Sequence, residues 1–121
     1  MSSRILSISY DSSLLHTRRL VLSHGGYDVE SAGDLASAVE LCRADKFDVV
    51  VIGHGVPLLE AATIVEVMRG RALIVSLFAG PGPRVEHADL YVDAADGPEQ
   101  LLSVLQAALE HNSRFGVQRA G

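Results

Sequence analysis

The sequence predicts an α/β fold, a single open sheet of five parallel strands with helices on both faces. Five short apolar stretches alternate along the 121 residues with four stretches of helical length. This alternation is typical of a doubly wound (βα)5 sheet, for which we expect the strand order 2-1-3-4-5. Right-handed crossovers place the loops that follow the strands at one edge, where a functional site is expected.

The first strand and helix precede a pair of glycines. ILSIS at 5–9 is the first expected strand, and Asp11-Ser12-Ser13 supplies N-cap candidates for the helix that follows. The expected helix over 14–24 ends at Gly25-Gly26, which is a common carboxyl-terminal signal.

The second strand and helix have different patterns. YDVESA at 27–32 alternates between apolar and polar residues, and we expect it near an edge of the sheet. Asp34 is the N-cap candidate of a helix over 35–44. Its apolar stripe holds Leu35, Ala38, Val39 and Cys42. Cys42 is therefore expected to be an unreactive core residue.

The third strand, FDVVVI at 47–52, has four consecutive β-branched residues and is expected to be the most buried. A helix over 58–69 follows and is closed by Gly70; its inward candidates include Ile64, Val67 and Met68. The fourth strand is ALIVSLF at 72–78.

The last elements are a short strand, LYV at 90–92, and a helix that begins at Pro98. Apolar positions 101, 102, 104, 105, 108 and 109 of this helix form one broad stripe. Between the last two strands lies GPGPRVEH at 80–87, whose glycines and prolines forbid a helix at its start. We expect a loop there.

The composition is that of one soluble domain, with 48% hydrophobic residues and a net charge of −5. An acidic chain is a poor nucleic-acid binder. Cys42 is the only cysteine, which excludes an internal disulfide and predicts a cytoplasmic location. We find no signal peptide and no membrane-spanning run. The domain is expected over 1–113, with a short flexible tail over 114–121.

Three blocks of the sequence resemble the receiver domain of bacterial two-component response regulators, which has a flavodoxin-like fold. ILSISYDSSLL is similar to the family's opening ILIVDDDxxLL. The run GYDVESA…HGVP over 26–57 follows GyxVxxAxxgxeAlxxxxxxxxDlvllDixMP without a gap. HADLYVDAADGPEQLL is similar to GADDYLxKPFxxeeLL. The resemblance covers about residues 4–110.

The resemblance also identifies five functional positions, and this chain differs at all of them. A working receiver has a phosphoryl-accepting Asp after the third strand, two acids for Mg²⁺ after the first, a hydroxyl after the fourth and a Lys after the fifth. Here Gly53 stands at the phosphoacceptor position, Ser9 and Tyr10 at the acid pair, Phe78 at the hydroxyl and Ala94 at the Lys. The resemblance thus implies no phosphoacceptor, no Mg²⁺ and no other cofactor.

A shifted alignment does not restore the missing acids. Moving the first strand by one residue would make Asp11 one of the acid pair, but the buried alternation would then face outward. After the third strand the next acid is Glu60, in the following helix. Lys46, the only lysine, precedes that strand and belongs to the opposite edge.

The loop at 80–87 stands where the family has its fourth helix. In typical relatives that helix forms the output and dimer face together with the fifth strand and the last helix. Its absence predicts uncovered apolar surface there, which is typical of a partner site. The interface candidates are Tyr91, Leu102 and Leu109.

The same edge offers further candidate residues. His54 and His87, with Asp11 or Asp93, offer metal or base chemistry, but no His pair has ligand spacing, and we expect surface histidines. Gly53-His54-Gly55 brings backbone N–H groups to the edge, as anion-binding loops do, yet it lacks the length and the Lys of a phosphate loop.

The sequence leaves two functional hypotheses. The first is a non-enzymatic, phosphorylation-independent module of bacterial signal transduction or transcriptional regulation. It acts through a protein partner or a homodimer, without nucleic acid or membrane. The alternative is a small-ligand sensor that uses the vacated pocket around Tyr10, His54, Phe78 and Asp93. An unrelated α/β enzyme would need a triad or metal site that these residues do not supply.

Overall fold

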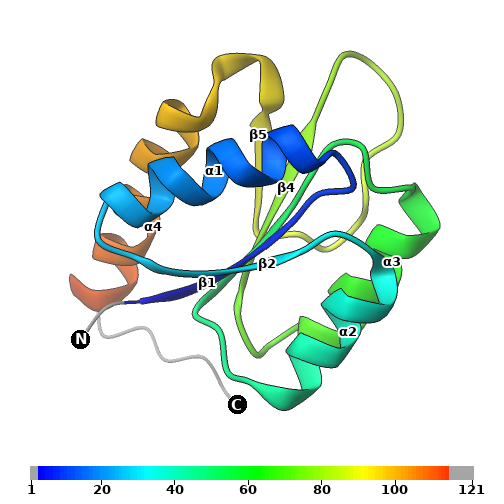
Figure 1. Ribbon diagram of the computed structural model, residues 1–121, viewed down its shortest axis with the longest axis horizontal. Helices are drawn as coiled ribbons and strands as arrows, with labels where there is room; N and C mark the ends of the chain where they lie inside the picture. The colour runs from blue at the N-terminus through cyan, green and yellow to red at the C-terminus, as the bar shows by residue number, and fades with distance from the viewer. Residues whose placement is uncertain (1–2, 115–121) are drawn as a thin grey trace.

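The computed structural model describes residues 3–114 (Figure 1). The strands are β1 (Arg4–Ile8), β2 (Asp28–Ala32), β3 (Val49–Ile52), β4 (Leu73–Phe78) and β5 (Leu90–Asp93). The helices of this part of the chain are α1 (Ser12–His24), α2 (Leu35–Ala44), α3 (Leu58–Met68) and α4 (Pro98–Arg114), and a 3-10 turn, η1 (Ala94–Asp96), precedes α4.

The five strands are parallel and have the order β2-β1-β3-β4-β5, as predicted. Figure 1 shows α1 and α4 together on one side of the sheet, and α2 and α3 together on the other. We call these sides the α1/α4 face and the α2/α3 face. Each face has its own hydrophobic core, so the sheet is the middle layer of three.

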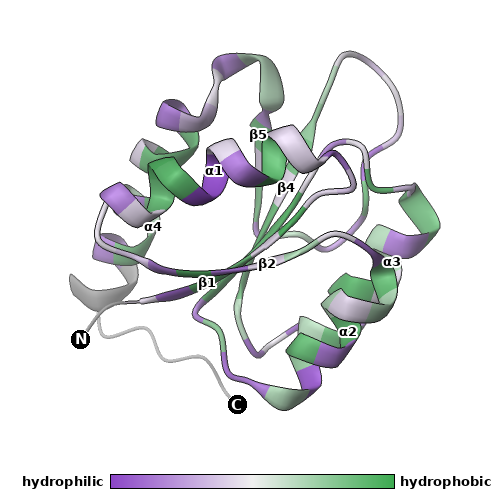
Figure 2. Ribbon diagram, in the orientation of Figure 1, coloured by the Kyte–Doolittle hydropathy of each residue, from purple (hydrophilic) through white to green (hydrophobic). Residues whose placement is uncertain are grey.

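β3 lies at the centre because its side chains are apolar on both sides. Val50 and Ile52 enter the core of the α2/α3 face, and Val49 and Val51 enter that of the α1/α4 face. All four residues are buried, which is typical of a central parallel strand. Figure 2 shows the same pattern, with hydrophobic residues along the middle strands.

The helix starts follow the predicted caps. The Asp11 carboxylate accepts hydrogen bonds from the N–H groups of Ser13 and Leu14, so α1 begins at Ser12, two residues before its predicted start. The Asp34 carboxylate caps α2 in the same way. Pro98 is the first residue of α4, as predicted. The cap, rather than the first apolar residue, sets where each of the first two helices begins.

Some predicted bounds are wrong, and the predicted inward residues differ in how deeply they are buried. β3 begins at Val49, not at residue 47, although Phe47 is buried. α3 ends at Met68, and Val67 is only half-buried, while its neighbour Val65 lies in the core. On α2, Ala38 and Cys42 are buried as predicted, whereas Leu35 and Val39 are half-buried. The last helix, predicted over 98–111, extends three residues further, to Arg114, and the remaining ends agree with the prediction to within two residues.

The connection from β4 to β5, residues 79–89, contains no helix, as predicted. It covers part of the sheet itself: the side chain of Val85 is buried in the core of the α2/α3 face. The Tyr91 hydroxyl donates to the Val85 carbonyl oxygen at 2.6 Å. Asp89 accepts from and donates to the backbone of Ile74. The prediction of an uncovered apolar surface here is therefore only partly right.

Exposed large apolar side chains occur mostly elsewhere among the described residues. Beside β5 only Tyr91 is of this kind, with 42% exposed. The others are Leu20 on α1 and Leu58 and Leu59 at the start of α3. Val85 fills the space that a helix would otherwise cover.

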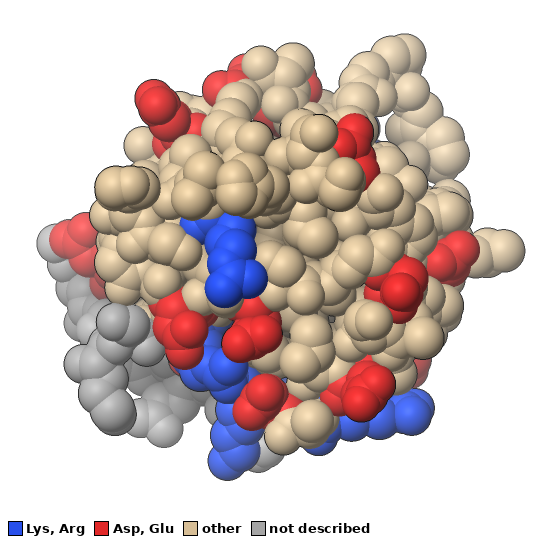
Figure 3. Space-filling view, viewed as in Figure 1, with Lys and Arg blue, Asp and Glu red and all other residues tan. Residues whose placement is uncertain are grey.

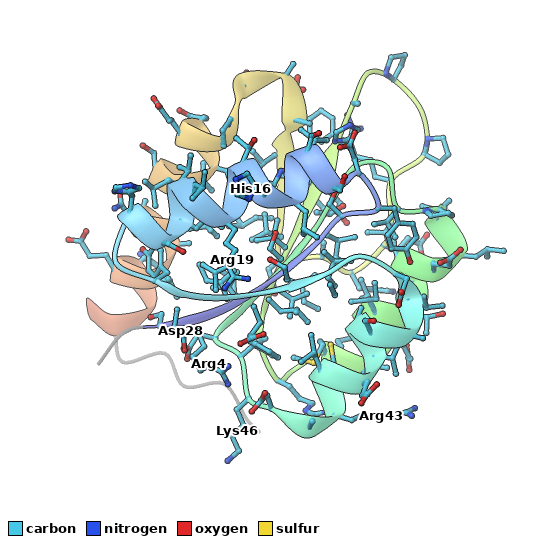
Figure 4. All side chains as sticks on the ribbon, viewed as in Figure 1. Arg4, His16, Arg19, Asp28, Arg43 and Lys46 are labelled. Carbon is cyan, nitrogen blue, oxygen red and sulfur yellow. The ribbon has the colours of Figure 1, made fainter. Side chains whose placement is uncertain are left out.

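The opposite edge of the sheet carries a surface charge network. The Arg4 guanidinium contacts carboxylates of β2 and of the end of α2, at 3.0 Å from Asp28 and 3.3 Å from Asp45. Figure 4 shows Arg4 beside Asp28, and Figure 3 shows basic side chains with acidic ones beside them on this face. Exposed pairs of this kind add little stability.

None of the described helices is long and apolar enough to cross a bilayer. Of the predicted tail 114–121, Arg114 is the last residue of α4, and residues 115–121 lie outside the described part of the chain.

Candidate functional site

The segments predicted to converge follow β1, β3, β4 and β5 and therefore lie at the carboxyl edge of the parallel sheet. β1 and β3 are neighbours in the sheet. β2 is added beyond β1 and β4 beyond β3, so the strand order reverses its direction between β1 and β3. In open α/β sheets the crevice at such a switch point is the usual ligand site. The predicted residues Ser9 and Gly53 follow these two strands.

Ser9 and Asp11 serve the local backbone. The Ser9 hydroxyl is buried; it accepts from the Asp11 N–H at 3.2 Å and donates to the Asp11 carbonyl at 3.3 Å. The Asp11 carboxylate is used to cap α1. These contacts hold the tight turn that leads from β1 into α1, so both residues have a structural role there.

Tyr10 joins this turn to α3. Its hydroxyl donates a hydrogen bond of 2.7 Å to Oε1 of Glu60, in the first turn of that helix. Burial and the Glu60 carboxylate both raise the pKa of the Tyr10 hydroxyl, so it stays a neutral donor.

Gly53 follows β3 and lies close against the backbone of β1. It is buried, and its N–H donates to the Ile8 carbonyl oxygen at 2.8 Å. A Cβ at this position would lie 2.8 Å from that same oxygen and 3.1 Å from Nη1 of Arg18. A side chain of any kind at residue 53 therefore needs a shift of β1, and glycine avoids that shift.

Arg18 is the site residue that sequence reasoning missed. It lies on α1, four residues after Leu14 and four before Leu22, and only 5% of it is exposed. Its Nη1 has no hydrogen-bond partner. Burial lowers the pKa of this guanidinium, while the Asp11 carboxylate acts in the opposite direction. The sequence contains one signal of this burial: the spacing 14, 18, 22 places residue 18 on the inward stripe of the helix.

Two separate cavities lie at this edge, where the prediction had one pocket. The larger, of about 220 Å³, is on the α2/α3 face and is lined by Gly53, His54 and Phe78 among others. His54 is exposed, and the Phe78 ring lies under the Arg84 guanidinium, 3.9 Å from its carbon to the ring centroid. Tyr10 lines neither cavity.

The smaller cavity, of about 50 Å³, is on the α1/α4 face, between α1, the end of β5 and the start of α4. Arg18, Asp93, Ala94 and Gly97 line it. The predicted residues His54 and Phe78 are thus on one side of the sheet, and Asp93 and Ala94 on the other.

Metal and thiol chemistry find little support in the described residues. Between residues 3 and 114 no three His, Cys, Asp or Glu side chains are grouped so that they could hold a metal ion. Cys42 is fully buried, and burial raises the pKa of its thiol, which disfavours the reactive thiolate.

The predicted interface residues are not equally exposed. Tyr91 is exposed on β5, but Leu102 and Leu109 are half-buried against the core of the α1/α4 face. Leu102 packs on Gly25, where a Cβ would lie 2.5 Å from Cδ1 of the leucine. Leu20, which the sequence analysis did not select, is 50% exposed and shares a hollow with Leu102.

No protein-family model matches the sequence, and no curated protein matches it significantly. Solved structures match the fold. A CheY-like response regulator receiver domain protein from Methanospirillum hungatei has a TM-score of 0.80 at 17% identity, over 95% of this chain and 99% of that chain. The signal receiver domain of an HD domain-containing protein from Pseudomonas fluorescens has 0.79 at 19% identity, over 94% and 99%.

A third match, the chemotaxis response regulator CheY4 of Vibrio cholerae, has a TM-score of 0.75 at 21% identity, over 88% of this chain and 98% of that chain. At such identities the likeness establishes the fold alone. It agrees with the strand order, the parallel sheet and the two helical layers. The chain therefore has the fold of a response regulator receiver domain.

Proposed function

We propose that this chain is a non-enzymatic signalling module of the receiver type that works without phosphorylation, through contact with a partner protein or a second copy. By the resemblance, its setting is bacterial signal transduction or transcriptional regulation. The observation that carries the proposal is the end of β3, where Gly53 lies against the Ile8 carbonyl and Arg18 and has no room for a carboxylate.

The chemistry of phosphoryl transfer explains why this matters. An acceptor carboxylate must meet the phosphorus in line, and a divalent cation held by further acids must neutralise the phosphoryl oxygens. At this edge Tyr10 is bound to Glu60, and Asp11 caps α1. The group buried beside Gly53 is the cation of Arg18, which repels Mg²⁺.

Exposure to acetyl phosphate and Mg²⁺ tests phosphorylation independence. We expect the intact mass of the chain to stay unchanged, because no side chain at the end of β3 can form an acyl phosphate. A receiver domain with a complete acidic pocket, treated in parallel, is the positive control. A stoichiometric mass increase of one phosphoryl group on this chain would contradict the proposal.

The surface around α4 supports a protein contact. Between α1 and α4 lies an open hollow of about 590 Å³, lined by Leu20, Val21 and Leu102 among others. On the other flank of α4 a second hollow, of about 430 Å³, is lined by Leu90, Val104 and neighbouring residues. Open apolar surface of this kind is typical of interaction sites. The most exposed apolar side chain of the first hollow is that of Leu20, which is 50% exposed.

Charge substitution in the first hollow tests whether a second copy binds there. We expect the wild-type chain to self-associate and Leu20→Glu to give a folded monomer in light scattering, because a carboxylate there would be desolvated on association. Leu102→Glu should also give a monomer, but it is a less specific test because Leu102 packs on Gly25 and its replacement also disturbs the contact between α1 and α4. The matched control is Leu59→Glu on α3, where the leucine is 84% exposed. An assembly state that Leu20→Glu leaves unchanged rejects this face for self-association.

A further inference from the structure

The cavity on the α2/α3 face lies where this chain has a loop in place of a helix. Its volume is about 220 Å³, and residues 79–85 of the β4–β5 connection form one wall. The loop after β3 and the first turn of α3 form another. Figure 1 shows the connection as an open arch beside the start of α3. Because this connection bounds it, the cavity is a feature of this chain rather than of the fold.

The inner surface of the cavity is mostly apolar. Ile52, Ala61 and Val85 line it and belong to the core of the α2/α3 face. The only buried polar side chain among the described lining residues is Ser76, which is 6% exposed. It follows Ile74 by two positions on β4 and therefore faces the same side of the sheet. The interior thus offers a ligand apolar contacts and one hydroxyl.

Arg84 lies at the rim of the cavity and is held there by an aromatic ring. Its guanidinium carbon is 3.9 Å from the centroid of the Phe78 ring, and both residues line the cavity. Arg84 is exposed, and it forms no ion pair with a described acid. A guanidinium on the face of a ring keeps the N–H donors at its edges available. Arg84 is therefore a positioned cation whose donors can bind an anionic group.

The lining of the cavity carries no negative charge. The chain has 15 Asp and Glu residues, yet none of the described residues that line the cavity is an acid. The acids next to it in the sequence have other contacts: Glu60 accepts from Tyr10, and Glu86 lies 3.9 Å from His87. Besides Arg84, the only ionisable side chain of this lining is the base His54. Such a lining favours an anionic ligand over a cationic one of the same shape.

We propose that this cavity binds a small monocarboxylic acid, with the carboxylate on Arg84 and the apolar body against Ala61 and Val85. A cavity of about 150 Å³ holds a benzene molecule, so one of about 220 Å³ has room for a ring or chain of about six carbons and its carboxylate. The two carboxylate oxygens match paired N–H donors of a guanidinium.

The two parts of the ligand have different roles. An exposed ion pair contributes little affinity, so burial of the apolar body provides most of it. Arg84 then provides the preference for an acid over a neutral molecule of the same size. The proposal goes beyond the protein contact proposed above and does not rest on it.

Methyl NMR of the full chain tests the proposal, with benzoate as the probe. We expect benzoate to shift the methyl signals of Ala61 and Val85 saturably in the wild type and in Arg43→Gln. Arg84→Gln should bind benzoate about fivefold more weakly, which corresponds to the loss of one well-positioned exposed ion pair. Arg43 is the matched control because it is an exposed arginine on α2, packed on the same face of the sheet, and does not line the cavity (Figure 4).

Two further probes define the ligand class. Benzamide has the size of benzoate without its charge, and it should bind the wild type and Arg84→Gln equally, about fivefold more weakly than benzoate binds the wild type. Hexanoate distinguishes the two sources of a small carboxylate: tighter binding of hexanoate than of benzoate assigns the site to aliphatic acids, and the reverse assigns it to aromatic ones.

Three results would overturn the proposal. The first is that benzoate leaves the methyl signals of Ala61 and Val85 unchanged, and the second is that the wild type and Arg84→Gln bind benzoate with equal affinity. The third is that inorganic phosphate displaces benzoate at equal concentration, which would show an unselective anion contact. The phosphorylation and self-association experiments do not depend on any of these results.

Discussion

Replacing Arg18 by Met is expected to raise the free energy of unfolding by about 1–4 kcal/mol. The side chain is 5% exposed, and Nη1 has no partner, so the native state bears a desolvation cost that the unfolded state does not. Methionine has a similar length and packs in irregular spaces without a charge. Denaturant unfolding with a constant m-value measures the change.

Arg19→Met is the control for this prediction, because it removes the same charge from the exposed side of α1 and should alter stability by less than about 0.5 kcal/mol. A less stable Arg18→Met would contradict this prediction and would show that the guanidinium is satisfied in the native protein.

The second large effect is expected at Gly53. Gly53→Ala should lower the free energy of unfolding by about 1–3 kcal/mol, because the added methyl group is forced against the Ile8 carbonyl oxygen and Arg18. Gly55→Ala is the matched control in the same loop, since a Cβ there meets nothing within 4 Å. It should be neutral or slightly stabilising.

An Arg18→Ala background separates the two contacts of residue 53. Most of the cost of Gly53→Ala should persist in it, because the nearer contact, at 2.8 Å, is with backbone that cannot turn away. A cost that disappears in this background would assign the conflict to Arg18 instead and would mean that the β1–β3 backbone tolerates a side chain. The double-mutant cycle is interpretable because both residues lie in one contact.

Local sequence signals were enough for the fold. The caps Asp11 and Asp34 and the start of α4 at Pro98 act through neighbours within a few residues and appear in the structure as predicted. The apolar run of β3 also forms a strand, although it begins two residues later than predicted. Strand order followed because parallel strands joined by right-handed crossovers allow few arrangements.

The site was less predictable because its contacts are distant in the sequence. Arg18 meets Gly53 across 35 residues, and Tyr10 meets Glu60 across 50. A charged residue on an amphipathic helix is normally solvated, so its burial shows only once α1 is packed on the sheet. The role of Val85 in covering the α2/α3 face was hidden for the same reason.

The connection over 79–89 also bears on motion in the native state. β5 is a four-residue edge strand, and on the α2/α3 face it is covered by irregular chain, whereas β3 is buried on both sides. Segments with few buried apolar contacts open at a small fraction of the global free energy. We therefore expect the amide hydrogens of β5 to exchange through local opening and those of β3 to exchange only through global unfolding. Hydrogen exchange measured residue by residue would then show the least protected strand of the sheet beside α4.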